Sequence, residues 1–151
     1  MITYQVTASA TMNAPAEQVY NIIADYRNGH PHILPKEFSN LVVEEGGYGA
    51  GTRIRFQMTA FGQTRTAQAI ITEPEPGRVL VETAPDGSVV TIFTVIPLEG
   101  GRSQVTFDTT LKSRDGFLGV LERFMSTRFL QRVYREELAL LAALAEKRAR
   151  I

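Results

Sequence analysis

Residues 105–148, VTFDTTLKSRDGFLGVLERFMSTRFLQRVYREELALLAALAEKR, change from one hydrophobic period to another. Every second residue from Val105 to Leu111 falls on one face, which is typical of a strand with one buried side. From about Asp115, which is placed to cap a helix, the pattern becomes helical, and good helix formers dominate as far as about Arg148. This stretch therefore predicts a last strand followed by a long C-terminal helix.

Six further strands are predicted upstream, where alternating apolar residues are separated by turns rich in glycine and proline. The first strand, residues 2–12, ends at Asn13-Ala14-Pro15, which opens a short helix. Residues 26–35 contain two prolines and two histidines, and they predict a loop or one short helical turn. The remaining strands are expected at residues 41–45, 53–60, 64–72, 79–82 and 89–96.

The turns between consecutive strands are short, which favours antiparallel pairing of neighbours. We therefore expect an α+β fold with a seven-stranded curved antiparallel sheet wrapped around the C-terminal helix, and two short helices after strand 1. The length of 151 residues suits one domain, so we assign residues 1–151 to a single domain.

Composition excludes several classes of function. Sixteen basic and sixteen acidic residues cancel, so we expect no nucleic-acid partner. The absence of cysteine excludes disulfides, thiolate metal sites and cysteine nucleophiles. No apolar run is long enough for stable membrane insertion, and the first residues do not resemble a signal peptide, so we expect a cytoplasmic protein.

Five short segments, in this order, resemble motifs of one superfamily: NAPAEQVY at 13–20, Asp25-Tyr26 followed by His30 and Pro35, GAGTR at 49–53, EPEPGR at 73–78, and PLEGGRSQVT at 97–106. The superfamily is the START-related, polyketide-cyclase and pollen-allergen group, and the resemblance covers the whole chain. Arg102-Ser103 departs from the usual Gly-Thr step of the last motif. The resemblance implies the helix-grip fold, with a cavity that takes lipids, sterols or aromatic polyketides. It does not imply one reaction, because members include carriers, cyclases, hydrolases and regulators.

An apolar and aromatic set is expected to line that cavity between sheet and helix, and few polar groups accompany it, as a hydrophobic ligand requires. The set comprises Tyr4, Tyr26, Phe56, Met58, Phe93, Phe107 and Phe124. The first hypothesis is therefore binding or transport of a hydrophobic small molecule that is lipid-like, sterol-like or similar to an aromatic polyketide. The alternative is a cyclase or dehydratase-like lyase without metal, and a further alternative is a protein-interaction module.

Candidate catalytic residues are few. Tyr26, His30 and His32 share one loop, where a histidine that titrates near neutrality lies close to a phenol. The two histidines have no third ligand at a suitable spacing, so they do not predict a zinc site. The sequence also lacks the glycine-rich loop with a lysine that is typical of a nucleotide-binding site. We therefore expect neither a metal nor a cofactor. Glu82, near a strand end, and Asp108, opposite the apolar face of its strand, are both expected to face solvent.

The C-terminal helix carries two apolar stripes. The first is assigned to the sheet: Phe117, Val120, Phe124, Thr127, Tyr134, Leu138, Leu141 and Ala145. One hypothesis for the second is self-association of two chains through Leu118, Met125, Phe129 and Val133. The alternative is that short helices and loops cover this stripe, or that Gly119 kinks the helix and changes its phase.

Overall fold

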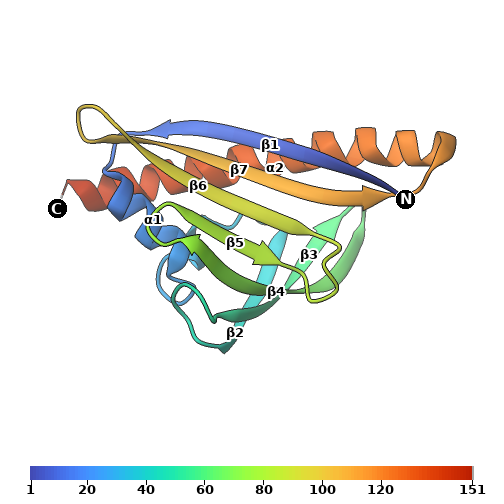
Figure 1. Ribbon diagram of the computed structural model, residues 1–151, viewed down its shortest axis with the longest axis horizontal. Coiled ribbons are helices and arrows are strands. Elements are labelled where there is room, and N and C mark those ends of the chain that lie inside the picture. Colours follow the sequence, from blue (N-terminus) through green and yellow to red (C-terminus); the bar gives the residue numbers. More distant parts are fainter. Residues whose placement is uncertain (151) are drawn as a thin grey trace.

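The computed structural model describes residues 1–150, and it shows one curved antiparallel sheet with a long helix packed along its concave side (Figure 1). The elements are β1 (Ile2–Met12), α1 (Ala16–Ala24), the 3-10 helix η1 (His30–Ile33), β2 (Phe38–Glu45), β3 (Arg53–Ala60), β4 (Gln63–Glu75), β5 (Val79–Thr83), β6 (Val90–Leu98), β7 (Arg102–Ser113) and α2 (Gly116–Ala149). The predicted α+β helix-grip fold is confirmed: seven strands, two short helices after the first strand, and a long C-terminal helix.

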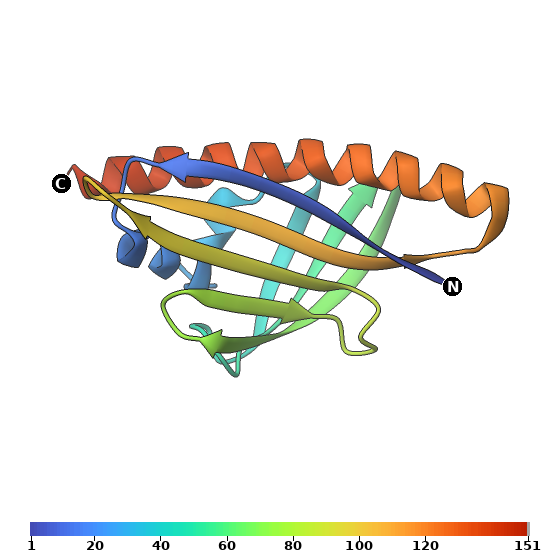
Figure 2. The ribbon, with the colours of Figure 1, turned by 45° about the horizontal axis from the view of Figure 1, so that its top comes forward.

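The sheet order is β1-β7-β6-β5-β4-β3-β2, so the first strand pairs with the last. Every other pairing joins consecutive strands, as the short turns predict. Figure 2 shows β1 running beside α2, while β3 and β4 run across the helix direction and meet α2 only at the end where they are joined, where Phe61 lies against Phe129. This arrangement leaves room between the helix and the middle of the sheet.

Three of the five segments that resemble superfamily motifs meet at the side chain of Glu73. The Tyr20 hydroxyl, from α1, donates a hydrogen bond to Glu73 Oε2 at 2.5 Å. The backbone N–H of Ala50, in the turn before β3, donates to Glu73 Oε1 at 2.7 Å. Gly49 in the same turn has a φ of +62°, and a Cβ there would collide with the Glu73 carboxyl. The motifs therefore attach α1 and the β2–β3 turn to β4.

The two halves of α2 have different surroundings. The C-terminal half buries Tyr134, Leu138 and Leu141 against the core, as predicted for the first stripe. The N-terminal half extends beyond the strands in Figures 1 and 2, and Phe117 and Phe124 there are 81% and 60% exposed. The assignment of Phe117, Val120 and Phe124 to the sheet was therefore wrong, because the helix is longer than the surface that covers it.

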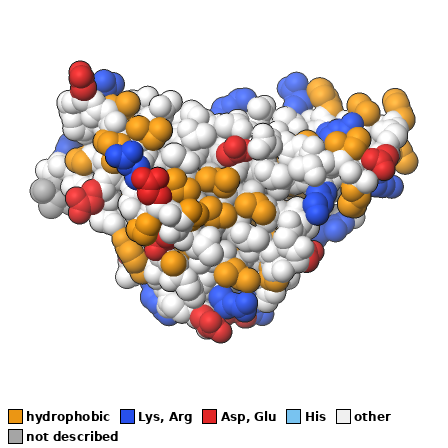
Figure 3. Space-filling model, viewed as in Figure 1, with side chains coloured by type: hydrophobic (Ala, Val, Ile, Leu, Met, Phe, Trp, Pro, Cys, Tyr) orange, Lys and Arg blue, Asp and Glu red, His pale blue; other side chains and the backbone are white. Residues whose placement is uncertain are grey.

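The second stripe is also divided between the two halves. Val133 has no exposed surface, so it cannot belong to an exposed strip. Leu118 and Met125 are exposed, and Figure 3 shows apolar side chains gathered at this end of the molecule. Part of the stripe is covered by a loop, because the ring of Phe61 in the β3–β4 turn lies 5.3 Å from that of Phe129. The helix assignment continues through Gly119. Self-association through Leu118, Met125 and Phe129 remains a prediction.

Candidate ligand-binding site

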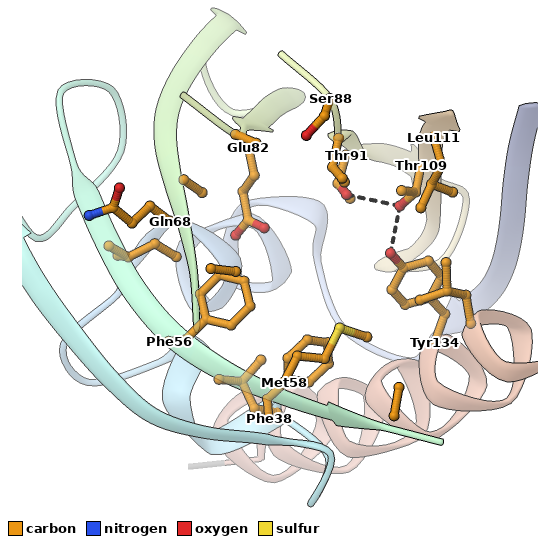
Figure 4. Close-up of a pocket in the computed structure, with 18 of the residues that line it drawn as sticks. Phe38, Phe56, Met58, Gln68, Glu82, Ser88, Thr91, Thr109, Leu111 and Tyr134 are labelled. Atoms are coloured by element: carbon orange, nitrogen blue, oxygen red, sulfur yellow. Dashed lines mark hydrogen bonds between the residues drawn. The ribbon is translucent and has the colours of Figure 1, made fainter. Parts of the chain in front are cut away.

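A cavity of about 740 Å³ lies between the concave face of the sheet and α2 (Figure 4). This volume is within the range of sites for small organic ligands, roughly 300–1,000 Å³. Its apolar wall comes from β2, β3, β4, β6 and β7, from α2, and from the turns at the mouth. This wall includes Leu34, Phe38, Leu41, Ile54, Phe56, Met58, Phe61, Ala67, Ala69, Val89, Phe93, Leu111, Phe129 and Leu130.

The register of β3 and β4 explains why this space is not filled. Phe56 pairs with Ala67, and Ile54 pairs with Ala69, so each large side chain has a methyl group beside it on the same face. A sheet with large residues on both strands would reach α2 and close the cavity. The small residues on β4 therefore leave space on this side of the cavity.

A polar row crosses the opposite side of the cavity. Strand register places Glu82 of β5, Thr91 of β6 and Thr109 of β7 next to one another on the inner face. The hydroxyls of Thr91 and Thr109 are 2.8 Å apart, and the Tyr134 hydroxyl of α2 lies 2.6 Å from that of Thr109. Burial raises the pKa of Tyr134 to about 12, so its phenol remains protonated at neutral pH. Figure 4 shows Glu82 and Tyr134 on two sides of the same space.

The carboxylate of Glu82 is held by the loop after α1. The Tyr26 hydroxyl donates a hydrogen bond to Glu82 Oε2 at 2.6 Å. Burial, together with the negative charge of Glu82, raises the pKa of Tyr26 well above its ordinary value, so Tyr26 remains a donor. His30 stacks on the Tyr26 ring with centroids 4.5 Å apart, and its Nε2 lies 3.8 Å from the same Glu82 oxygen. Because its Nδ1 faces the carbonyl of Ile23 at 2.7 Å, Nδ1 carries a proton.

Glu137 brings a second carboxyl group to the cavity, from α2. Its side chain belongs to the lining, and the residue is only 3% exposed. Burial, followed by the negative charge of Glu82, raises the pKa of Glu137 well above its ordinary value. Burial and the charge of Glu82 act on this carboxyl without a hydrogen bond from another group within residues 1–150. The cavity therefore contains an acid that favours its uncharged form and has a hydrogen bond available.

The structure brings only part of the predicted set to the cavity. Phe56, Met58, Phe93 and His30 line it. Tyr26 lies behind Glu82, to which it donates its hydrogen bond, and is itself outside the lining. Phe107 packs behind Phe93, with ring centroids 4.8 Å apart.

The other predicted residues lie elsewhere. Tyr4 is on β1 and packs against the edge of the core. Phe124 is on the exposed half of α2, and His32 is exposed on η1. No group of three or more metal-ligating side chains occurs in the described part of the chain. No helix within residues 1–150 is both long enough and apolar enough to cross a membrane.

Two carboxyl groups of the site are not among the residues that the sequence predicts for it. Glu82 was expected in solvent, but its side chain is 16% exposed and lines the cavity. The buried Leu80 lies two residues before it, on the same face of β5, but Val79 and Val81 make the other face apolar as well. Glu137 lies three residues after Tyr134 and four before Leu141, within the stripe that was assigned to the sheet. Asp108 lies opposite the buried Phe107 and Thr109, as predicted.

The solved structures that resemble this chain share its whole architecture. The KanY protein, solved by NMR, has 28% identity and a TM-score of 0.84, covering 97% of this chain and 99% of that one. A protein from Thermus thermophilus has 23% identity and a TM-score of 0.79, with coverage of 97% and 99%. The Zhui aromatase/cyclase from Streptomyces sp. R1128 has 19% identity and a TM-score of 0.77, with coverage of 97% and 96%.

No curated protein matches this sequence significantly. The family model described as polyketide cyclase / dehydrase and lipid transport matches residues 3–146, which is nearly the entire chain. The predicted resemblance to the START and polyketide-cyclase group is thereby confirmed. This chain belongs to the polyketide cyclase / dehydrase and lipid transport family.

Proposed function

We infer that this protein binds a hydrophobic small molecule between the sheet and α2, with the polar end of that molecule near Glu82, Tyr134 and Glu137. The supporting observation is the cavity of about 740 Å³, whose wall is mainly aliphatic and aromatic. Burying apolar ligand surface contributes roughly 25 cal/mol per Å², which provides affinity without many directed contacts. The ligand classes that suit this wall are lipids, sterol-like molecules and aromatic polyketides.

Binding is tested by titrating the neutral dye Nile red into the protein and following its fluorescence. Ala67→Trp places an indole in the cavity opposite Phe56, so we expect it to abolish the fluorescence increase. Thr72→Trp is the matched control, because Thr72 is exposed on the same strand and lies outside the lining. Circular dichroism of both variants checks that they are folded. Equal binding by wild type and Ala67→Trp, or no binding by wild type, contradicts the proposal.

A second candidate is a cyclase or dehydratase, and the observation that favours it is the pair of carboxyl groups in the lining: Glu82, which accepts a hydrogen bond from Tyr26, and the buried Glu137. Glu82, as a carboxylate, takes a proton from the carbon beside one ketone of a bound diketone. That carbon then bonds to the second carbonyl carbon, whose oxygen receives a proton from Glu137. Loss of water from the resulting alcohol yields a conjugated ring, and the proton on Glu82 returns to Glu137 through that water.

This candidate is tested with an acyclic diketone that closes to a conjugated cyclic enone, followed by the enone absorbance. We expect Glu82→Gln and Glu137→Gln each to lower the rate by about 10²–10⁴-fold, the usual effect of removing a general acid or base. Substituting Tyr26, His30 and His32 together tests the candidate catalytic residues that the sequence predicts. Glu136→Gln is the control, because Glu136 is exposed on the next position of α2. An unchanged rate in both carboxyl variants rejects the enzyme.

A further inference from the structure

The ionisable groups that line the cavity are acidic, apart from one histidine ring. Glu82, Asp86 and Glu137 line it, and no lysine or arginine is among the lining residues. Asp86 lies in the turn before β6, where its Oδ1 accepts hydrogen bonds from the N–H and hydroxyl of Ser88. His30 is the one basic ring in the lining, and its Nδ1 is occupied by the Ile23 carbonyl. The polar end therefore offers no cation to an anionic ligand.

Two arginines on the adjoining elements lie outside the lining, and the guanidinium of one of them, Arg132, is 5.4 Å from the ring centroid of the lining residue Phe129. Arg65 lines a separate groove with Met58, Ala60, Phe61 and Gln63, and its guanidinium donates to Gln63 Oε1. Arg132 of α2 is mostly exposed and faces Glu37 at 3.8 Å. Neither residue belongs to the cavity lining. A ligand carboxylate at the polar end would therefore face Glu82 without a counter-ion.

The hydrogen-bonding groups at this end suit a neutral acceptor. Glu137 is buried and has no partner within the described residues, and the Tyr134 hydroxyl has one pairing, with Thr109. A protonated carboxyl and a phenol both donate, so a ketone or alcohol oxygen placed between them completes their hydrogen bonds. A carboxylate in the same place loses its hydration and is repelled by Glu82.

We propose that the polar end of this cavity accepts ligands with an uncharged, hydrogen-bond-accepting head group, such as a ketone or alcohol, and rejects carboxylates. This specificity rests on the proposed binding function, since it concerns the same cavity. Its structural basis is the juxtaposition of Glu82 and Glu137 in a lining that contains no lysine or arginine. The apolar wall supplies most of the affinity, while these two carboxyls decide which head groups are accepted.

The experiment uses three ligands with the same alkyl chain that end in an alcohol, a carboxylate or an amine. Each displaces Nile red from the full-length protein at neutral pH, below its micelle concentration. We expect the alcohol to bind about tenfold or more tightly than the carboxylate, as one uncompensated charge contact of this kind implies. We expect Glu82→Gln to reduce that ratio to about threefold or less, because the repelling charge is removed.

Asp108→Asn is the matched control for net charge. Asp108 is on the outer face of β7, where it accepts a hydrogen bond from Thr7, so its loss leaves the ratio unchanged. Equal affinities of carboxylate and alcohol for the wild type would overturn the specificity, and so would tighter binding of the amine than of the alcohol. Failure of all three ligands and of the dye to bind is a different result, because it rejects the binding function itself.

Discussion

The hydroxyl of Tyr26 lies 2.6 Å from Oε2 of Glu82, although the two residues are 56 positions apart in the sequence. Tyr26 comes from the loop after α1 and Glu82 from β5, and their contact directs the Glu82 carboxylate into the cavity. His30, stacked on Tyr26, closes the same cluster from η1. A loop outside the sheet therefore positions the principal charge of the site.

Tyr26→Phe removes this hydrogen bond and keeps the ring that stacks on His30. We expect the free energy of unfolding to fall by about 1.5–3 kcal/mol, because the acceptor is charged and partly buried. Urea unfolding followed by circular dichroism measures the change. Tyr4→Phe is the control, since no hydrogen bond of the Tyr4 hydroxyl occurs within residues 1–150, and it should change stability by less than about 0.5 kcal/mol. Equal changes in the two variants contradict this role of Tyr26.

Glu137→Gln should change how stability depends on pH. The folded-state pKa of Glu137 is raised above its unfolded value, so the folded protein binds the extra proton between these two values. The contribution of this proton to the free energy of unfolding is therefore fully present below the pKa of Glu137 in the unfolded chain, about 4.3. It is lost as the pH rises toward the pKa in the folded protein. The variant lacks this loss, so between about pH 5 and pH 8 its advantage over wild type should grow as the pH rises.

Urea unfolding at several pH values measures this difference. Glu136→Gln, one residue earlier and exposed, should follow the wild-type curve. A constant difference between wild type and Glu137→Gln across this range would show that the Glu137 carboxyl does not carry a raised pKa.

Gly49→Ala should be much more damaging than Gly51→Ala. Both glycines have positive φ, +62° and +91°, so alanine is strained at either position. A Cβ at position 49 also meets the Glu73 carboxyl that holds Tyr20 and Ala50, whereas a Cβ at position 51 has nothing within 4 Å. We expect Gly49→Ala to cost about 1–3 kcal/mol more in the free energy of unfolding. Thermal unfolding of both variants tests this, and similar melting temperatures would assign the whole effect to the backbone.

Because the two halves of α2 differ in burial, truncating an apolar side chain in each half should change the free energy of unfolding by very different amounts. Leu141→Ala, in the buried half, should lower the free energy of unfolding by about 2–5 kcal/mol. Phe124→Ala, in the exposed half, should change it by less than about 0.5 kcal/mol in dilute solution. Urea midpoints at low protein concentration separate these outcomes. A large loss in Phe124→Ala would indicate that another surface covers this half of the helix.

Much of the fold was predictable from local pattern. Alternation in residues 2–12 and 105–111, helical spacing after Asp115, and glycine-rich turns each depend on neighbouring residues alone. Antiparallel order follows, because short turns leave consecutive strands adjacent. The same local patterns placed Phe56, Met58 and Phe93 on the inner face, where they line the cavity.

The two carboxyl groups could not be placed in this way. Residues 79–81 are Val-Leu-Val, so both faces of that strand are apolar and its pattern does not distinguish them. Only the register with β6, which sets Glu82 beside Thr91, decides that its side chain is inside. Similarly, Phe124 and Tyr134 both belong to the first apolar stripe of α2, but only Tyr134 is buried against the sheet.

By itself, the sequence determined which segments are strands and helices, their order, and which residues are apolar enough to form an inner wall. Only the tertiary structure decided that this wall encloses space, and that Glu82 and Glu137 face it. The physical reason is that periodicity results from contacts between near neighbours in the chain. A cavity and the charges in it depend instead on strand register, sheet curvature and the position of α2, which are set by contacts between distant residues.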